Sequence, residues 1–141
     1  MANIIYTGKT YSSFSGFSDN AIFKMSNGSY WVQTKYKYWY HYAYRPDVVI
    51  SEENGQTILT VAGHSIPVKR VYDVIESQID GEFNGWDGNT RYKLTNGQEW
   101  QQTEYHYCYK YAYRPDVMIY QIGGKSMMYV DGTQATVKRL Y

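Results

Sequence analysis

Hydrophobic and polar residues alternate through most of this chain, in short runs separated by Gly, Asn, Asp and Pro. The strictest alternation places a tyrosine at every second position from Tyr36 to Tyr44, and again from Tyr105 to Tyr113. Successive side chains of a β-strand point to opposite faces of its sheet. The pattern therefore predicts two strands that each carry five tyrosines on one face.

The two tyrosine runs belong to an internal repeat. Residues 14–72 align with residues 83–141 without a gap at a constant offset of 69, and 27 of these 59 positions are identical. The longest shared phrase is Tyr-Ala-Tyr-Arg-Pro-Asp-Val, at 42–48 and 111–117. Two ungapped copies indicate a duplicated module. We therefore predict two domains, residues 1–72 and 80–141, joined by a linker at 73–79.

Turn residues divide each copy into short strands. Asn27-Gly28 and Asn96-Gly97 separate alternating runs. This predicts β-hairpins with type I′ turns, in which both central residues need a positive φ. Five or six short antiparallel strands in about 60 residues, with no long crossover, favour a small bent barrel. The predicted fold class is all-β, and two tandem SH3-like barrels fit it best. A single sheet or sandwich shared by both copies is the alternative.

The junction between the copies departs from the strand pattern. Asp73 and Glu76 have the spacing of a helix capping box, and the apolar residues between positions 71 and 79 could share one helical face. We predict that residues 71–78 form a short linker of one or two helical turns.

The tyrosine runs are the main candidate site. A ten-residue strand spans roughly 33 Å, whereas strands usually have five or six residues, so part of each row should extend beyond its own barrel. Exposed phenol rings could stack on sugar rings, single-stranded bases or proline-rich peptides. Alternatively, the rows form the interface between the copies or between two subunits. The candidate ligand-binding or interface residues are Tyr36, Tyr38, Tyr40, Tyr42, Tyr105, Tyr107, Tyr109, Tyr111, Trp31 and Trp100.

Trp31 and Trp100 directly follow the predicted hairpin turns and share a strand face with Gln33 and Gln102. A core tryptophan beside a hydrogen-bonded glutamine is the default interpretation. A binding groove lined by both residue types is the alternative.

Two further patterns have structural interpretations. On the strand face opposite the tyrosines, Lys37 matches His106 and His41 matches Lys110, which is typical of a solvated basic face. Arg-Pro-Asp at 45–47 and 114–116 predicts a turn that redirects the chain, because proline has no amide to donate to a sheet. Its Arg and Asp could pair with each other or bond the amides of the turn.

Metal binding and catalysis receive little support. The three histidines are not repeated between the copies and lack metal-ligand spacing, so we predict no metal and no cofactor. The single cysteine, Cys108, cannot form an intramolecular disulfide. The rival hypothesis is a small hydrolase or nuclease that uses a histidine with Arg114 and Asp116. A histidine within hydrogen-bond reach of an aspartate, such as His41 or His106, would support it.

Composition narrows the partners. The formal net charge is +1, and basic and acidic residues are nearly balanced in the segments before and after residue 79, which argues against duplex DNA. The N-terminal residues lack the apolar stretch of a signal peptide, and no apolar run is long enough to cross a membrane. We therefore expect a cytoplasmic protein without membrane attachment.

The second copy carries the string Leu94-Thr95-Asn96-Gly97-Gln98-Glu99-Trp100-Gln101-Gln102, followed by the tyrosine run and Arg-Pro-Asp-Val-Met-Ile. In this string it resembles small bacterial proteins of unknown function with the pattern Leu-x-Asn-Gly-Gln-x-Trp-x-Gln. The first copy departs from the string at Met25, Ser29 and Val32. The resemblance implies an SH3-like fold and no particular activity.

Together, these features predict a non-enzymatic binding or assembly module that presents tyrosine-rich strands. Its expected partner is a protein, a peptide, a glycan or a single-stranded nucleic acid, or a second subunit in a homodimer.

Overall fold

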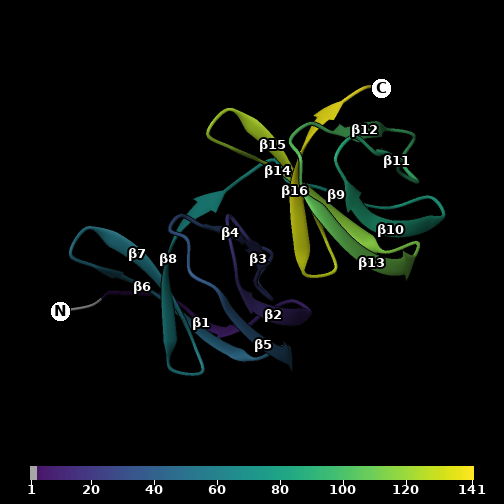
Figure 1. Ribbon diagram of the computed structural model, residues 1–141. Helices are drawn as coiled ribbons and strands as arrows, with labels where there is room; N and C mark the ends of the chain where they lie inside the picture. The colour runs from purple at the N-terminus through teal and green to yellow at the C-terminus, as the bar shows by residue number, and fades with distance from the viewer. Residues whose placement is uncertain (1–2) are drawn as a thin grey trace. The chain divides into compact units, whose positions relative to one another are not determined.

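The computed structural model describes residues 3–141 and divides the chain into two compact units, Met1–Tyr72 and Asp73–Tyr141. Every regular element in the described range is a β-strand, which confirms the all-β prediction (Figure 1). Since residues 3–141 contain no helix, none of them belongs to a helix that could cross a membrane.

The first unit builds two sheets. Six strands form an antiparallel sheet in the order β1-β6-β7-β8-β4-β3, and β2 pairs with β5 in a separate two-stranded sheet, which we call the first ribbon. The bounds are β1 (Asn3–Lys9), β2 (Ser13–Phe17), β3 (Ile22–Lys24), β4 (Tyr30–Gln33), β5 (Trp39–Tyr44), β6 (Asp47–Glu53), β7 (Gln56–Val61) and β8 (His64–Val71).

The second unit has the same order of strands. Its six-stranded sheet runs β9-β14-β15-β16-β12-β11, and β10 pairs with β13 in what we call the second ribbon. The bounds are β9 (Ile75–Gln78), β10 (Glu82–Asp87), β11 (Arg91–Lys93), β12 (Glu99–Gln102), β13 (Tyr107–Tyr113), β14 (Asp116–Ile122), β15 (Lys125–Val130) and β16 (Thr133–Arg139). Each unit thus has more strands than the five or six that the sequence predicted.

The predicted helix at 71–78 is wrong, because Ile75–Gln78 forms strand β9 on the edge of the second sheet. Ile75 pairs with Ile119 and packs against the core, and burial alternates along the strand. The capping-box spacing supplies at most one pair of end contacts, whereas the edge of β14 offers a full set of backbone partners. In the first unit, Tyr6 of β1 pairs with Ile50 of β6, which is the pairing of Ile75 with Ile119 shifted by 69 residues. The structural repeat therefore begins before residue 14.

Each unit encloses its own hydrophobic core. In the first unit the core is built from Phe14, Phe17, Ala21, Phe23, Met25, Trp31, Val48, Ile50, Leu59, Val61, Ile66 and Val68. The offset of 69 maps this cluster onto the core of the second unit with one exception. Ala21 has no counterpart in the second core, which contains Ile79 instead. The repeated apolar pattern therefore specifies the same interior twice.

The predicted hairpins exist as β3–β4 and β11–β12, but their turns are not type I′. Gly28 has a φ of 87°, whereas Asn27 does not lie in the positive region. The Gly28 amide donates to the Met25 carbonyl and the Met25 amide donates to the Ser29 carbonyl, both at 2.9 Å. This is the three-residue hairpin loop with glycine in its last position. The Asn27 side chain stabilises it by accepting the Ser29 amide at 3.0 Å.

Pairs of positive φ angles occur instead in the hairpins of the large sheets. Asn54 and Gly55 join β6 to β7 with φ values of 51° and 78°. Gly123 and Gly124 join β14 to β15 with 56° and 80°. These two-residue loops meet the conformational requirement of a type I′ turn, which matches the twist of the flanking strands.

Candidate binding surface

The tyrosine strands lie at the free edges of the two ribbons. Among residues 3–141, β5 forms a ladder with β2 alone and β13 forms one with β10 alone, so each has a second edge without a strand partner. β5 has six residues and β13 has seven, both shorter than the predicted ten. Residues 34–38 and 103–106 precede them as irregular lead-in segments.

All ten tyrosines of the two runs are exposed, with exposed fractions between 52% and 81%. Within β5, Trp39, His41 and Ala43 are half-buried and alternate with exposed tyrosines, as the period of two predicted. β13 shows the same alternation. We call the exposed side of each run its tyrosine face. The first comprises Tyr36, Tyr38, Tyr40, Tyr42 and Tyr44, and the second comprises Tyr105, Tyr107, Tyr109, Tyr111 and Tyr113.

Trp31 and Trp100 do not contribute to this surface. They are only 5% and 4% exposed and belong to the two hydrophobic cores. The indole N–H of Trp31 donates to Ser29 Oγ at 2.9 Å, and that of Trp100 donates to Gln98 Oε1 at 3.1 Å. A buried ring with a satisfied N–H is typical of a core residue, so the structure favours the core interpretation of these two tryptophans over the binding groove.

Buried glutamines hold the lead-in segments in place. Gln33 Nε2 donates to the carbonyls of Lys35 and Lys37, and its Oε1 accepts the Ser18 amide at 3.0 Å. In the second unit, Gln102 Nε2 donates to the carbonyls of Glu104 and His106, at 3.0 and 2.9 Å. An amide side chain has two donors and an acceptor that match these backbone groups. The tyrosines of the lead-in segments therefore project from a fixed backbone.

A glycine shapes each ribbon. Phe14 lies opposite Ala43 and Gly16 opposite Tyr40, so a single residue of β2 faces two residues of β5 in a β-bulge. Gly16 has a φ of 98°, and a Cβ placed there would lie 1.9 Å from the Trp39 carbonyl oxygen. Gly85 has a φ of 95° and the corresponding distance to Cys108 is 1.8 Å. Only glycine allows the two backbones to approach so closely.

The Arg-Pro-Asp turn carries the chain from the ribbon into the large sheet. Arg45 and Arg114 have positive φ values of 49° and 48°, which is uncommon for any residue other than glycine. The Arg45 amide donates to the Ser12 carbonyl, and the Thr10 amide donates to the Pro46 carbonyl. The prediction of a turn that redirects the chain is confirmed.

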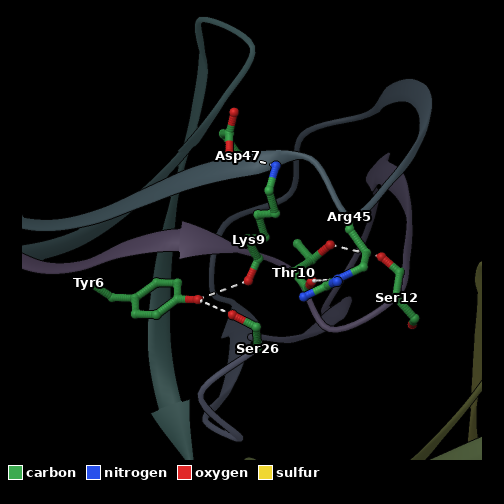
Figure 2. A network of polar contacts seen from close by, with 7 residues as sticks. All are labelled: Tyr6, Lys9, Thr10, Ser12, Ser26, Arg45 and Asp47. Carbon is green, nitrogen blue, oxygen red and sulfur yellow. Dashed lines mark hydrogen bonds and ion pairs between the residues drawn. The ribbon is translucent and has the colours of Figure 1, made fainter.

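The charged side chains of this turn contact Lys9 at the end of β1 and Thr10 directly after it, rather than each other (Figure 2). Asp47 pairs with Lys9 at 2.9 Å, and Arg45 Nε donates to the Thr10 carbonyl at 3.4 Å. In the second unit, Arg114 lies 4.0 Å from Asp80. The turn is therefore held to the end of β1 and the residue after it in the first unit, and to the segment that follows β9 in the second.

Polar groups lie beside the tyrosines and differ between the ribbons. Ser13 Oγ lies 3.4 Å from the Tyr42 hydroxyl, whereas the Tyr111 hydroxyl donates to Glu82 Oε1 at 3.3 Å. Partial desolvation, followed by the charge of Glu82, raises the pKa of Tyr111 above its usual value. The second tyrosine face thus contains a carboxylate where the first has a neutral hydroxyl.

The lead-in segments also differ in charge. Lys35 and Lys37 precede β5, and Glu104 and His106 occupy the equivalent positions before β13. Glu104 accepts a hydrogen bond from Lys125 at 2.6 Å, and this bond, together with the lysine charge, lowers the pKa of Glu104. Lys37 donates to the Ser65 carbonyl at 3.2 Å.

The histidines do not form the contact with an aspartate that would support the enzyme hypothesis. The rings of His41 and His64 stack on Trp39, with centroid distances of 4.9 and 3.9 Å. His106 is exposed, and in residues 3–141 no histidine bonds an aspartate carboxylate. The same range contains no group of three or more His, Cys, Asp or Glu residues placed to hold a metal ion. The enzyme hypothesis therefore gains no support from the geometry.

No protein-family model matches the chain, and neither a curated protein nor a solved structure shows a significant match. Function must therefore be inferred from the exposed chemistry of the two ribbons.

Proposed function

We propose that the protein is a non-enzymatic binding or assembly module, built as two tandem SH3-like barrels, whose contact surfaces are the two tyrosine faces. The observation that carries the proposal is the exposure of all ten tyrosines at equivalent positions of the two units. Duplicating a surface of this kind costs solubility, because exposed aromatic patches favour association. Its presence in both units is accounted for if the rings contact a partner.

The exposed area is large enough for recognition. A tyrosine offers about 150–250 Å² of contact area. Five tyrosines that are roughly two-thirds exposed therefore present about 650 Å² in each ribbon. The largest apolar patch on a typical monomer is about 300–600 Å² and is often functional. Each tyrosine face exceeds what a surface without a partner usually carries.

The supporting elements favour binding without large rearrangement. Gln33 and Gln102 fix the backbone of the lead-in segments, and the glycine bulges fix the ribbons against the cores. Tyrosine side chains have only two rotatable χ angles, so ordering them on contact costs little conformational entropy. Phenol rings held in this way can stack on a partner and donate hydrogen bonds at their edges.

The SH3-like assignment is supported by the short antiparallel strands, by their tight turns and by two sheets that pack around one core in each unit. The bulge in each ribbon and the Arg-Pro-Asp turn supply the sharp changes of direction that a small barrel needs.

The proposal is tested by replacing Tyr40 and Tyr109 with serine in one chain. Both side chains are more than 60% exposed, so the melting temperature should stay nearly unchanged while binding is lost. Binding is measured on arrays of glycans, proline-rich peptides and single-stranded oligonucleotides, and self-association by light scattering. The matched control is Tyr11→Ser with Tyr72→Ser, two exposed tyrosines outside the ribbons.

Two results would contradict the proposal. Binding that survives the ribbon substitutions would place the contact surface elsewhere. A large fall in melting temperature with the ribbon pair but not with the control pair would show that the tyrosines hold the fold together.

A further inference from the structure

We propose that the first tyrosine face docks on the second tyrosine face of another copy of this chain. This inference rests on the proposed function and names the partner of the same surface. Three observations carry it: the opposite charges of the two units, the placement of those charges at the ends of the rows, and the area that the two faces present.

The two structural units carry opposite net charge. Residues 1–72 contain seven Lys and Arg against four Asp and Glu, which gives a formal charge of +3. Residues 73–141 contain seven against nine, which gives −2. The difference follows the structural boundary, because Asp73 and Glu76 belong to the second unit. Opposite charges speed the encounter between complementary surfaces and suppress wrong pairings.

The charges that differ lie at the ends of the tyrosine rows. The first row is preceded by Lys35 and Lys37 and followed by Arg45. The second row has Glu104 before it, paired with Lys125, and Glu82 opposite Tyr113 at its other end, where Arg114 follows the row as Arg45 follows the first. Positive groups therefore lie at both ends of the first row and carboxylates at both ends of the second. Either alignment of the two rows brings Lys35 and Lys37 to an end of the second row that carries a carboxylate, Glu104 or Glu82.

The chemistry of the faces fits this pairing. Tyrosine rings attract ammonium and guanidinium groups through cation–π interactions, so the lysines of the first ribbon can contact the rings of the second. Lys24 already lies 3.9 Å above the ring of Tyr11 in the first unit, which is the same type of contact. Glu82 would then form an ion pair at the edge of the contact.

The area is sufficient for a stable contact. Each tyrosine face presents about 650 Å² of ring surface, and the polar rim adds to it. A standard specific interface buries about 800 Å² on each partner. One first face against one second face therefore approaches a standard contact.

Like faces should not pair with each other. Two first faces would bring Lys35 and Lys37 against their own copies or against Arg45, and two second faces would bring Glu82 and Glu104 against their own copies or each other. The contact is therefore heterologous. It closes into a dimer if two chains engage each other through both faces, and it continues into longer assemblies if each chain binds two different neighbours.

The test measures molecular mass by light scattering across a range of concentrations of the full chain. The wild type should show a mass of two or more chains that falls on dilution. Lys35→Glu with Lys37→Glu should weaken association about tenfold or more, and Glu82→Lys with Glu104→Lys should do the same. Combining all four changes in one chain restores opposite charges and should recover much of the association.

Matched controls come from charges outside the ribbons. Lys69→Glu, and Glu52→Lys with Glu53→Lys, reverse exposed charges on β8 and β6 and should leave association unchanged. Circular dichroism of every variant separates loss of association from loss of fold.

A wild type that stays monomeric at every concentration would overturn this inference, as would association that resists both the charge reversals and Tyr40→Ser with Tyr109→Ser. A monomer that still loses a glycan, peptide or oligonucleotide ligand on the tyrosine substitutions would overturn the inference and leave the proposed function standing. A monomer that binds nothing on those arrays would overturn both.

Discussion

The two units share the same order of strands, but different aromatic side chains pack at equivalent positions beneath the ribbon. In the first unit, Trp39 of β5 packs against Phe17 of β2, with ring centroids 5.1 Å apart. In the second unit, Cys108 replaces Trp39, and Trp86 of β10 replaces Phe17. The large ring has moved from one strand of the ribbon to the other. A core tolerates substitutions that keep its volume, so paired changes of this kind preserve the fold.

The polar residues next to this aromatic ring also differ between the two units. Trp39 stacks with His41 and His64, whereas Lys110 and Thr133 stand at those positions in the second unit. There Trp86 Nε1 donates to Thr133 Oγ1 at 3.0 Å. The bulge glycine and the five tyrosines of each ribbon are shared, whereas the side chains that pack beneath the ribbon differ. The comparison therefore separates the requirements of the fold from those of the surface.

The largest expected effect is at the shared bulge glycine. Gly85→Ala should destabilise the second unit by about 4 kcal/mol or more, because the new Cβ would overlap the Cys108 carbonyl oxygen. Gly97→Ala is the matched control: it has a positive φ of 90° but no atom within 4 Å, so it should cost only about 1–2 kcal/mol. Chemical denaturation measures both. Equal losses would show that backbone strain, rather than the close approach, makes the glycine necessary.

The next effect is at the shared glutamine. Gln102→Leu keeps the approximate volume but removes hydrogen bonds to four backbone groups, two amides and two carbonyls, in two segments. We expect a loss of about 3 kcal/mol in the free energy of unfolding. Gln101→Leu, at the half-buried neighbouring position, should lose less than 1 kcal/mol, roughly the value of one partly exposed hydrogen bond. Hydrogen exchange of residues 103–106 should increase only for Gln102→Leu.

The two cores differ at one residue that makes the stability of the second unit depend on pH. Burial raises the pKa of Tyr92 to about 12, whereas the first unit has Phe23 at this position. The unfolded chain loses this proton near pH 10, so the stability that Tyr92 contributes is intact below pH 10 and is lost as the pH rises towards 12. The loss for the second unit should reach about 2–3 kcal/mol.

Tyr92→Phe tests this pH dependence directly. It removes the hydrogen bond to the Gly85 carbonyl at 2.8 Å and should cost about 1 kcal/mol at neutral pH. The variant should also lose less stability between pH 10 and pH 12 than the wild type does. Parallel alkaline profiles for the two proteins would show that Tyr92 does not control the transition.

The last prediction concerns the ring that differs between the two ribbons. Trp39→Cys imitates the second unit and should cost about 2 kcal/mol, less than for a fully buried tryptophan because Trp39 is half-buried. Adding Phe17→Trp should recover part of this loss, since it restores the pair found as Trp86 and Cys108. A double-mutant cycle measures the coupling. Additive losses would mean that the two units reached their packing independently.

The sequence alone determined the local and repeated features of this protein. Alternation at Tyr36–Tyr44 fixed which side chains share a strand face, because side-chain direction in a strand has a period of two. The offset of 69 predicted two matching cores, and proline with a preceding arginine predicted the turn at 45–47. These are properties of neighbouring residues, or of a pattern that occurs twice, so no knowledge of distant contacts was needed.

Only the tertiary structure decided features that depend on residues far apart in the chain. Strand β9 shares no identical residue with the equivalent part of β1, and the edge of β14 converts it from a predicted helical linker into a strand. Trp31 and Trp100 look alike in sequence whether they line a groove or a core, and packing placed them in the core. The structure also showed why Gly16 and Gly85 are required, since the atoms that a Cβ would meet lie on a strand more than twenty residues away.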